Sequence, residues 1–168
     1  IQQCTLALSG NYNLNFVSDD LTITTLAITV TADPQTKIYG DVDPALTYQI
    51  TTGALVGTDN FTGALTRVAG EDVGTYAIQQ GTLALSGNYT LAYVGDDLTI
   101  TPRPIEVTAV TDTKAYDGNT SSVGVPTITS GTLVGTDAFT LTQTFDTKDI
   151  GTNKALIPLA VISSGDAN

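Results

Sequence analysis

The stretch EDVGTYAI, Glu71 to Ile78, decides the fold class of this chain. A turn with acidic residues and a glycine runs directly into a segment that carries Tyr76. Aspartate and glycine favour turns, whereas threonine, tyrosine and isoleucine favour strands. Two structures fit this order: a glycine turn followed by a strand with a buried tyrosine, or a corner where the tyrosine hydroxyl bonds to nearby backbone.

The rest of the chain has the same strand-and-turn pattern. Apolar residues alternate with threonine in residues 28–32, and a similar alternation returns in 46–50 and 89–93. A period of two indicates half-buried strands. Clusters of Gly, Asp, Asn and Pro separate these runs at intervals of roughly 8 to 12 residues, which is typical of an antiparallel sandwich or barrel. No apolar period of 3.6 is long enough for a helix, so we expect neither crossover connections nor a parallel sheet.

The form Asp72-x-Gly74-x-Tyr76 is the one that leads into a corner strand of immunoglobulin-like sandwiches. We therefore predict an all-β chain of tandem antiparallel immunoglobulin-like β-sandwich modules, each with about seven strands. The alternative is a β-grasp-like module, which would need a helix packed on a sheet. Near the C-terminus the same motif keeps Asp149 and Gly151 but has Asn153 in place of the tyrosine, so we expect a weaker corner there.

Two internal repeats divide the chain. The segment IQQGTLALSGNYTLAYVGDDLTIT, residues 78–101, has a near copy at residues 1–24 that is identical at 19 of 24 positions and lies 77 residues earlier. GALVGTDNFT, which begins at Gly53, returns as GTLVGTDAFT from Gly131. We infer three pieces: an N-terminal segment (residues 1–24) that is the closing part of a preceding module, a complete central module (25–101), and a C-terminal module (102–168) that lacks its closing part.

This organisation predicts how the pieces relate. Both copies of the long repeat should form the same pair of strands. The junctions at residues 24–27 and 101–104 are too short for flexible linkers, and the prolines of the second favour extended backbone. Successive modules should therefore form a stiff rod.

Several motifs of the central module resemble a known family. KIYGDVDPALTY from Lys37, GALTR from Gly63, GEDVGTYAI from Gly70 and GTLALSGNYTL from Gly81 are similar to the MBG module of very large bacterial surface proteins and adhesins. KAYDGNT, which begins at Lys114, is similar to the YDG-type module that often follows MBG repeats. The resemblance implies a stalk or fibre repeat, extracellular at the bacterial cell surface, and not an enzyme. A glycan-binding or host-surface-binding module is the alternative.

Charge and composition exclude several function classes. The net charge of −11, from 17 acidic and 6 basic residues, repels nucleic acid and anionic membranes. No apolar run approaches the roughly 18 residues of a membrane span. The chain has no histidine, which removes every mechanism that needs a histidine base or ligand. We therefore expect neither an enzyme nor a nucleic-acid or membrane partner.

Calcium is the one ion that the acidic turns suggest. Carboxylates at module ends are the hard oxygen ligands that calcium prefers, although aspartates in turns often cap their own backbone instead. The weak candidates are Asp41, Asp43, Asp96 and Asp97, with Asp19, Asp20, Glu71 and Asp72 beside them. We expect no other cofactor.

Two further positions suggest contacts between or within chains. Lys37 and Lys114 occupy matching places, which repeat ancestry explains as well as a lysine–asparagine crosslink. Cys4 stands where the later copy has Gly81, and we expect it to lie near an interchain contact. The expected partners are a host or matrix surface and neighbouring copies stacked head to tail. In such a stack residues 11–24 of one copy would complete the open end of the next, unless a longer parent chain supplies those strands itself.

Overall fold

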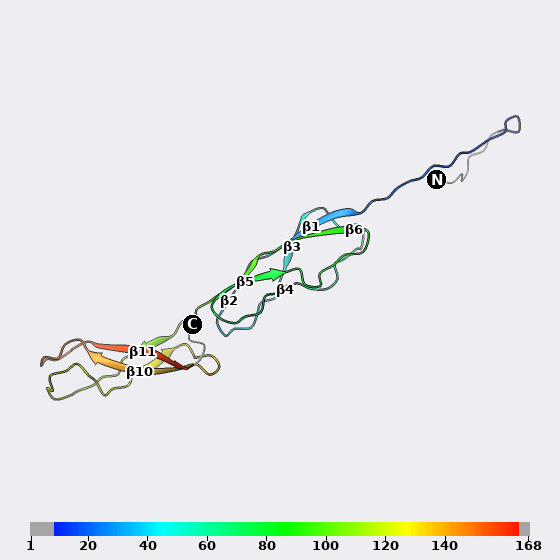
Figure 1. Ribbon diagram of the computed structural model, residues 1–168. Helices are drawn as coiled ribbons and strands as arrows, with labels where there is room; N and C mark the ends of the chain where they lie inside the picture. The colour runs from blue at the N-terminus through cyan, green and yellow to red at the C-terminus, as the bar shows by residue number, and fades with distance from the viewer. Residues whose placement is uncertain (1–8, 165–168) are drawn as a thin grey trace.

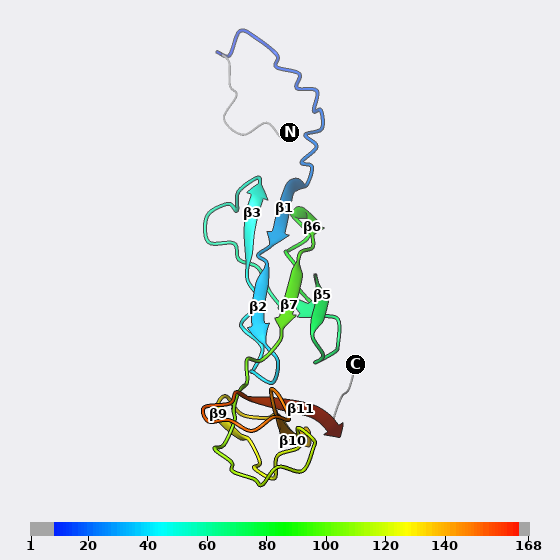
Figure 2. The same cartoon turned by 90° about the vertical axis from the view of Figure 1, so that its left-hand side faces the viewer.

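The computed structural model of the protein describes residues 9–164, and these form an elongated all-β chain (Figure 1). The N-terminal segment, the central module and the C-terminal module follow one another along the long axis (Figures 1 and 2). The all-β prediction is confirmed. No helix occurs among residues 9–164, so the helix that a β-grasp requires is missing from the described part of either module.

The central module consists of seven strands in two sheets. One sheet has the order β3-β1-β6 and the other the order β2-β7-β5-β4. Threonine and apolar residues alternate along these strands, because threonine tolerates solvent on one face while the other face packs inward. The strands are β1 (Leu26–Ala32), β2 (Gln35–Ile38), β3 (Tyr48–Thr52), β4 (Thr66–Arg67), β5 (Gly74–Gln79), β6 (Tyr89–Val94) and β7 (Asp97–Thr101).

Two of the strand pairs are parallel. β1 pairs with β6 from Leu26↔Tyr89 onward, β2 pairs with β7 from Gln35↔Leu98 onward, and both registers join residues 63 apart. β1-β2 and β6-β7 therefore run side by side along the module, each interrupted by a short break between its two strands (Figure 2).

The expectation of no crossover connections was wrong, because each sheet contains one parallel pair, although neither sheet is parallel throughout. The immunoglobulin-like arrangement stays a prediction. Parallel strands need a long crossover connection, which is usually a helix. Here β3, β4 and β5 provide that connection, and β3 and β5 themselves pair antiparallel with β1 and β7.

One hydrophobic core joins the two sheets. β1 contributes Ile28, Val30 and Ala32, the inward phase of its alternation. The other buried members come from β5, β6, β7 and the connections between strands: Leu65, Ile78, Leu83, Tyr89 and Leu98. Burying apolar area at about 25 cal/mol per Å² is the main force that holds the sheets together.

The C-terminal module repeats the first strands of the central module. Its strands are β8 (Glu106–Thr108), β9 (Thr127–Ser130), β10 (Ala138–Phe145) and β11 (Leu156–Ser164), in the pairs β8-β9 and β10-β11. The pair β1/β3 has an irregular register between Thr29 and Val30, and β8/β9 has one at the matching place between Glu106 and Val107. The sequence repeat is therefore also a structural repeat.

The N-terminal segment differs from its copy in the central module. Residues 9–24 form no strand, and Tyr12, Leu21 and Ile23 are mostly exposed. The prediction that both copies form the same strands was wrong for these residues. The later copy pairs with β1, β2 and β5, and these strands are already paired within the central module. Cys4 lies outside the described residues.

Candidate functional site

The tyrosine of the EDVGTYAI stretch closes a corner at the start of β5. The hydroxyl of Tyr76 donates to the backbone oxygen of Asp72 at 2.9 Å. The guanidinium of Arg67 lies over the Tyr76 ring, 5.5 Å from its centroid. Gly70 has a φ of 149°, and a Cβ there would lie 2.1 Å from the Tyr76 ring. The ring therefore requires a glycine at position 70, which the sequence reasoning did not recognise.

Four charged side chains meet beside this corner. The Lys37 Nζ lies 2.7 Å from the Asp43 carboxylate and 2.5 Å from that of Glu71. Arg67 bonds the same two carboxylates, at 2.6 Å to Asp43 and 2.5 Å to Glu71. The Lys37 side chain is only 4% exposed, and a charge so buried is stable only when it is paired. We call Lys37, Asp43, Arg67 and Glu71 the ion cluster.

The ion cluster stays fully charged near neutral pH. Hydrogen bonds from Arg67 and then Lys37 lower the pKa of Asp43 to about 2. Hydrogen bonds from Lys37 and then Arg67 lower the pKa of Glu71, and those to Asp43 and then Glu71 raise the pKa of Lys37. None of the four groups therefore exchanges a proton near pH 7, so the cluster is suited to holding loops together rather than to acid–base chemistry.

Two of the four calcium candidates are held by cations. Asp43 belongs to the ion cluster, and Asp41 forms an ion pair with Arg103. Asp96 instead accepts a hydrogen bond from the backbone N–H of Asp97 at 2.8 Å, as an aspartate in a turn does. Within residues 9–164, no group of three or more acidic or cysteine side chains is arranged to hold a metal ion.

The two matching lysines have different partners. Lys37 contacts carboxylates and not an asparagine, whereas the Lys114 Nζ lies 2.9 Å from both the Asn119 Oδ1 and the Asp117 carboxylate. Lys114 also lies 5.6 Å above the centroid of Phe145. Lys37 therefore lies in a cluster of four charges, whereas Lys114 lies beside an amide, one carboxylate and an aromatic ring.

A direct contact joins the two modules. The Arg103 Nε donates to the backbone oxygen of Tyr39 at 2.7 Å, and the Tyr39 hydroxyl donates to Asp137 at 3.2 Å. Gly40 packs on Val134 so closely that a Cβ would lie 2.4 Å from its methyl group. A cavity of ≈430 Å³ lies beside these contacts. The sequence predicted a stiff junction but not these residues.

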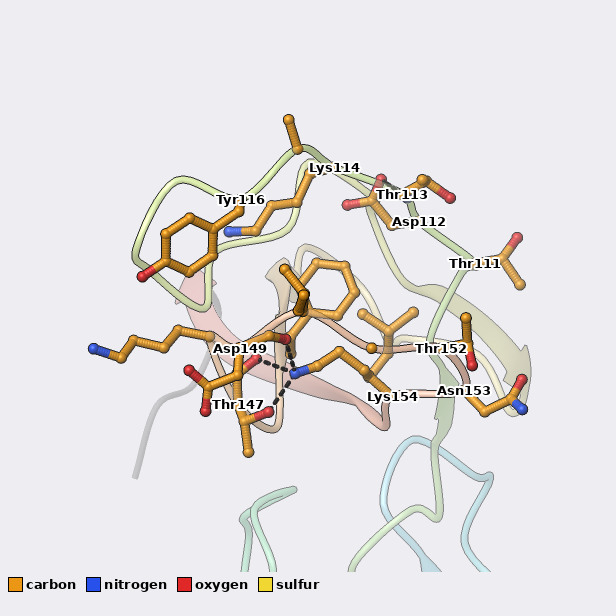
Figure 3. Close-up of a pocket in the computed structure, with 16 residues that line it drawn as sticks. Thr111, Asp112, Thr113, Lys114, Tyr116, Thr147, Asp149, Thr152, Asn153 and Lys154 are labelled. Carbon is orange, nitrogen blue, oxygen red and sulfur yellow. Dashed lines mark hydrogen bonds between the residues drawn. The ribbon is translucent and has the colours of Figure 1, made fainter.

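A larger hollow of ≈640 Å³ lies in the C-terminal module (Figure 3). Its walls are residues 111–116 and 147–154, with Phe145 and Leu156. The Lys154 Nζ bonds the backbone oxygens of Thr147 and Asp149 at 2.9 and 2.5 Å, which fixes one wall. Asn153, which stands where the corner tyrosine would be, has a left-handed φ of 57°. Asparagine tolerates this conformation better than other residues with a side chain.

The fold and these contacts define an all-β protein of tandem modules with a direct junction. Residues 28–99 match the family model of the MBG domain (YGX type), and residues 101–168 match that of the YDG domain. The chain is therefore an MBG-type module followed by a YDG-type module, as the motifs indicated. Neither curated proteins nor solved structures yield a match. No helix of the described residues is long and apolar enough to cross a membrane.

Proposed function

We propose that this chain is a stalk or fibre segment of a large extracellular bacterial adhesin or surface filament, which it spaces and stiffens. The observation that carries the proposal is the long parallel pairing of the central module. The chain enters this module through β1 and leaves it through β7, at opposite ends of the long axis (Figure 2). The resemblance to MBG and YDG modules supports the extracellular setting.

This arrangement resists force along the axis. A pull on both ends of the module slides β1-β2 against β6-β7, and six residue pairs of β1/β6 and four of β2/β7 oppose the sliding. These pairs carry the load together, because the force is parallel to the strands and therefore perpendicular to much of each hydrogen bond. A pair that is opened from one end breaks its bonds one after another and yields at lower force.

The junction contacts extend the resistance from one module to the next. Arg103 anchors the linker to the backbone of Tyr39, and Asp137 of the C-terminal module receives the Tyr39 hydroxyl. Val134 fills the space above Gly40. Since these contacts come from both modules, bending at the linker has to break them.

The test is single-molecule pulling of the central module in two directions. In a Cys4→Ser background, handles at Thr25→Cys and Thr101→Cys load β1-β2 and β6-β7 in shear. The matched control has handles at Thr25→Cys and Thr52→Cys, which open the antiparallel pair β1/β3 near one end, where Thr29 lies opposite Thr52. We expect a several-fold higher unfolding force in the first geometry. Equal forces in the two geometries would contradict the stalk role.

A ligand-binding module is the second candidate, because Tyr116 is 63% exposed at the edge of the ≈640 Å³ hollow. Exposed aromatic rings beside polar groups suit sugar recognition. Screening of the chain on glycans and host matrix proteins tests this candidate. Binding that Tyr116→Ala abolishes would favour it over the stalk, and binding that this variant keeps would not.

A further inference from the structure

The same turn occurs in both modules. Residues 56–59 and 134–137 both have the sequence VGTD. In each of them the backbone N–H of the aspartate donates to the backbone oxygen of the valine, at 3.1 Å and 3.0 Å. The glycine has a left-handed φ in both, 60° in the first and 57° in the second. The two segments, which we call the VGTD turns, therefore have the same shape.

The VGTD turns also have the same place in their modules. Each follows a glycine that packs on the start of the module. A Cβ at Gly53 would lie 2.5 Å from the backbone oxygen of Ala27, and a Cβ at Gly131 would lie 2.5 Å from that of Pro104. Both turns are therefore anchored at the end where the chain enters the module.

At the junction, the second VGTD turn fits against a tyrosine and a glycine of the central module. A Cβ at Gly40, whose φ is 83°, would lie 2.4 Å from a methyl group of Val134. The Tyr39 hydroxyl donates to the Asp137 carboxylate at 3.2 Å. The first and last residues of the turn thus contact Tyr39 and Gly40, which we call the Tyr-Gly socket. A side chain at position 40 would take the space of Val134.

The VGTD turn of the central module presents the same groups. Val56 is 63% exposed, so its side chain is not part of the core of its own module. The Tyr89 hydroxyl fixes this turn, because it accepts from the Val56 N–H at 2.9 Å and donates to Oδ2 of Asp59 at 2.6 Å. An ionised carboxylate accepts several hydrogen bonds, so Asp59 can also receive the hydroxyl of a docking tyrosine.

The matching turn of the C-terminal module has a different order. With the 77-residue offset, Asp117 stands where the socket has Gly40, and the left-handed glycine follows one residue later at Gly118, with a φ of 79°. The Asp117 carboxylate lies 2.9 Å from the Lys114 Nζ. A side chain at this position would fill the space that Val134 needs at the junction.

We propose that the VGTD turn is the docking element of both modules and that its partner is the Tyr-Gly socket of an MBG-type module. Val56–Asp59 is then a docking surface for the socket of another MBG-type module. The socket accepts an MBG-type or a YDG-type module, since both carry the turn. The YDG-type turn does not accept it, because Asp117 excludes the valine. Exclusion of this kind gives specificity to an interface.

The inference goes beyond the stalk role, since the order and orientation of modules would matter in a ligand-binding protein as well. The pulling experiment loads the strands of a single central module. Its failure would leave the docking contact untouched, and a failure of the docking contact would leave the pulling result untouched.

The first experiment is a double-mutant cycle at the junction of this chain. Spin labels at Val94→Cys and Lys148→Cys, in a Cys4→Ser background, report the distance between the modules. Gly40→Ala should shift and broaden the distance distribution, because the added methyl group meets Val134. Gly40→Ala/Val134→Ala should give the distribution of Val134→Ala alone, because the clash is then removed. Such dependence of one substitution on another identifies a direct contact.

Gly57→Ala is the matched control for this cycle. Gly57 also has a left-handed φ, but nothing lies within 4 Å of its Cβ position, so the substitution adds strain without a contact and should keep the wild-type distribution. An unchanged distribution for Gly40→Ala would refute the proposal. A change that is equally large with and without Val134→Ala would also refute it, because backbone strain would then be the cause.

The second experiment gives the socket the order of the C-terminal turn. Gly40→Asp/Asp41→Gly should separate the modules, because the aspartate side chain excludes Val134. Asp41→Gly alone is the control, since it removes only the ion pair with Arg103. If the exchange had no more effect than this control, the socket would not select against the YDG-type turn.

The third experiment tests the docking surface Val56–Asp59. A chain in which residues 25–101 occur twice in tandem places this turn of the second copy beside the socket of the first. Leu26 stands there in place of Arg103, so the Arg103 contacts cannot hold this junction. Spin labels at Val94→Cys in both copies, again with Cys4→Ser, should give one narrow distance distribution.

Gly40→Ala in the first copy should broaden this distribution, whereas Gly40→Ala in the second copy acts on the following junction and should leave it unchanged. A broad distribution before any substitution would show that Val56–Asp59 does not dock. A narrow one that Gly40→Ala in the first copy leaves unchanged would show that the junction forms without the socket, and would refute the proposal as well.

Discussion

Lys37 shows how one buried charge can organise the end of a module. Its amine is nearly inaccessible to water, while Asp43 and Glu71 are 40% and 64% exposed and reach it from the two loops above. A buried ion pair is weak evidence for added stability, but the loss of one partner leaves an unpaired charge and destabilises the fold. The carboxylates are therefore needed to keep Lys37 where it lies.

The ion cluster predicts a dependence of stability on pH. The folded-state pKa of Asp43, about 2, is below its ordinary value of 3.8. The stabilisation is therefore complete above about pH 4 and is lost as the pH falls through about 2. Asp43→Asn should reduce the unfolding free energy at pH 7 by about 1 kcal/mol, since solvent screens this partly exposed pair. It should also flatten the acid decline, as followed by urea unfolding between pH 7 and 2.

Exposed Asp20 provides the control for this prediction. Asp20→Asn removes the same charge from a segment outside the modules and should keep the wild-type pH profile. Asp112 and Asp117 also have lowered pKa values, through hydrogen bonds from Ser122 and Lys114 respectively. The measured quantity is therefore the difference in unfolding free energy between the variant and the wild type at each pH. If the unfolding free energy of Asp43→Asn fell with acid as steeply as that of the wild type, the prediction for Asp43 would be contradicted.

At the scale of elements, the two modules share a strand irregularity with a fixed backbone requirement. Gly53 follows β3 with a φ of 80°, and Gly131 follows β9 with a φ of 81°. A Cβ at either position would lie 2.5 Å from a backbone oxygen, of Ala27 and Pro104 respectively. The close approach of the chain at this point, and not only the turn, requires glycine.

Alanine substitutions separate the two requirements. Gly57 also has a left-handed φ, of 60°, but nothing lies within 4 Å of its Cβ position. Gly57→Ala should therefore cost only the backbone strain of about 1–2 kcal/mol. Gly53→Ala adds a clash with Ala27 and should cost clearly more, as measured by thermal unfolding. Gly131→Ala should destabilise the C-terminal module in the same way. Equal losses of stability for Gly53→Ala and Gly57→Ala would show that the close approach to Ala27 does not contribute to the requirement for glycine.

At the scale of the whole molecule, the junction decides whether two modules behave as a rod. Arg103 reaches back from the linker to Tyr39 and Asp41, and these contacts lie outside the hydrophobic core of the central module. Their loss should therefore change the orientation of the modules without changing the stability of either one.

Arg103→Ala tests this separation. We expect small-angle X-ray scattering to show a broader distribution of distances and a smaller mean length, while the free energy of unfolding of either module changes by no more than about 0.5 kcal/mol. Lys148→Ala removes one positive charge from the C-terminal module, away from the junction, and should keep the wild-type scattering curve. An unchanged curve for Arg103→Ala would mean that the remaining contacts, Tyr39 with Asp137 and Gly40 with Val134, already hold the junction.

The sequence by itself determined the local structure and the repeat. Alternation of apolar residues with threonine predicted the strands, because side chains on a strand point to alternate faces. The bond from Tyr76 to Asp72 spans only four residues, so a short motif could indicate it. The two modules could also be recognised from the sequence, because a structural unit that occurs twice produces two similar stretches of sequence.

Only the tertiary structure decided strand direction, partners and the ion cluster. A period of two is the same in parallel and antiparallel strands, so nothing in the alternation indicated that β1 and β6, 63 residues apart, run parallel. Lys37 meets Glu71 across 34 residues because two loops converge over the end of β2. Leu21 is exposed and Leu98 is buried although both stand in the same sequence, DDLTIT. Whether a side chain is buried depends on which other strands pack against it, and the local sequence does not determine that.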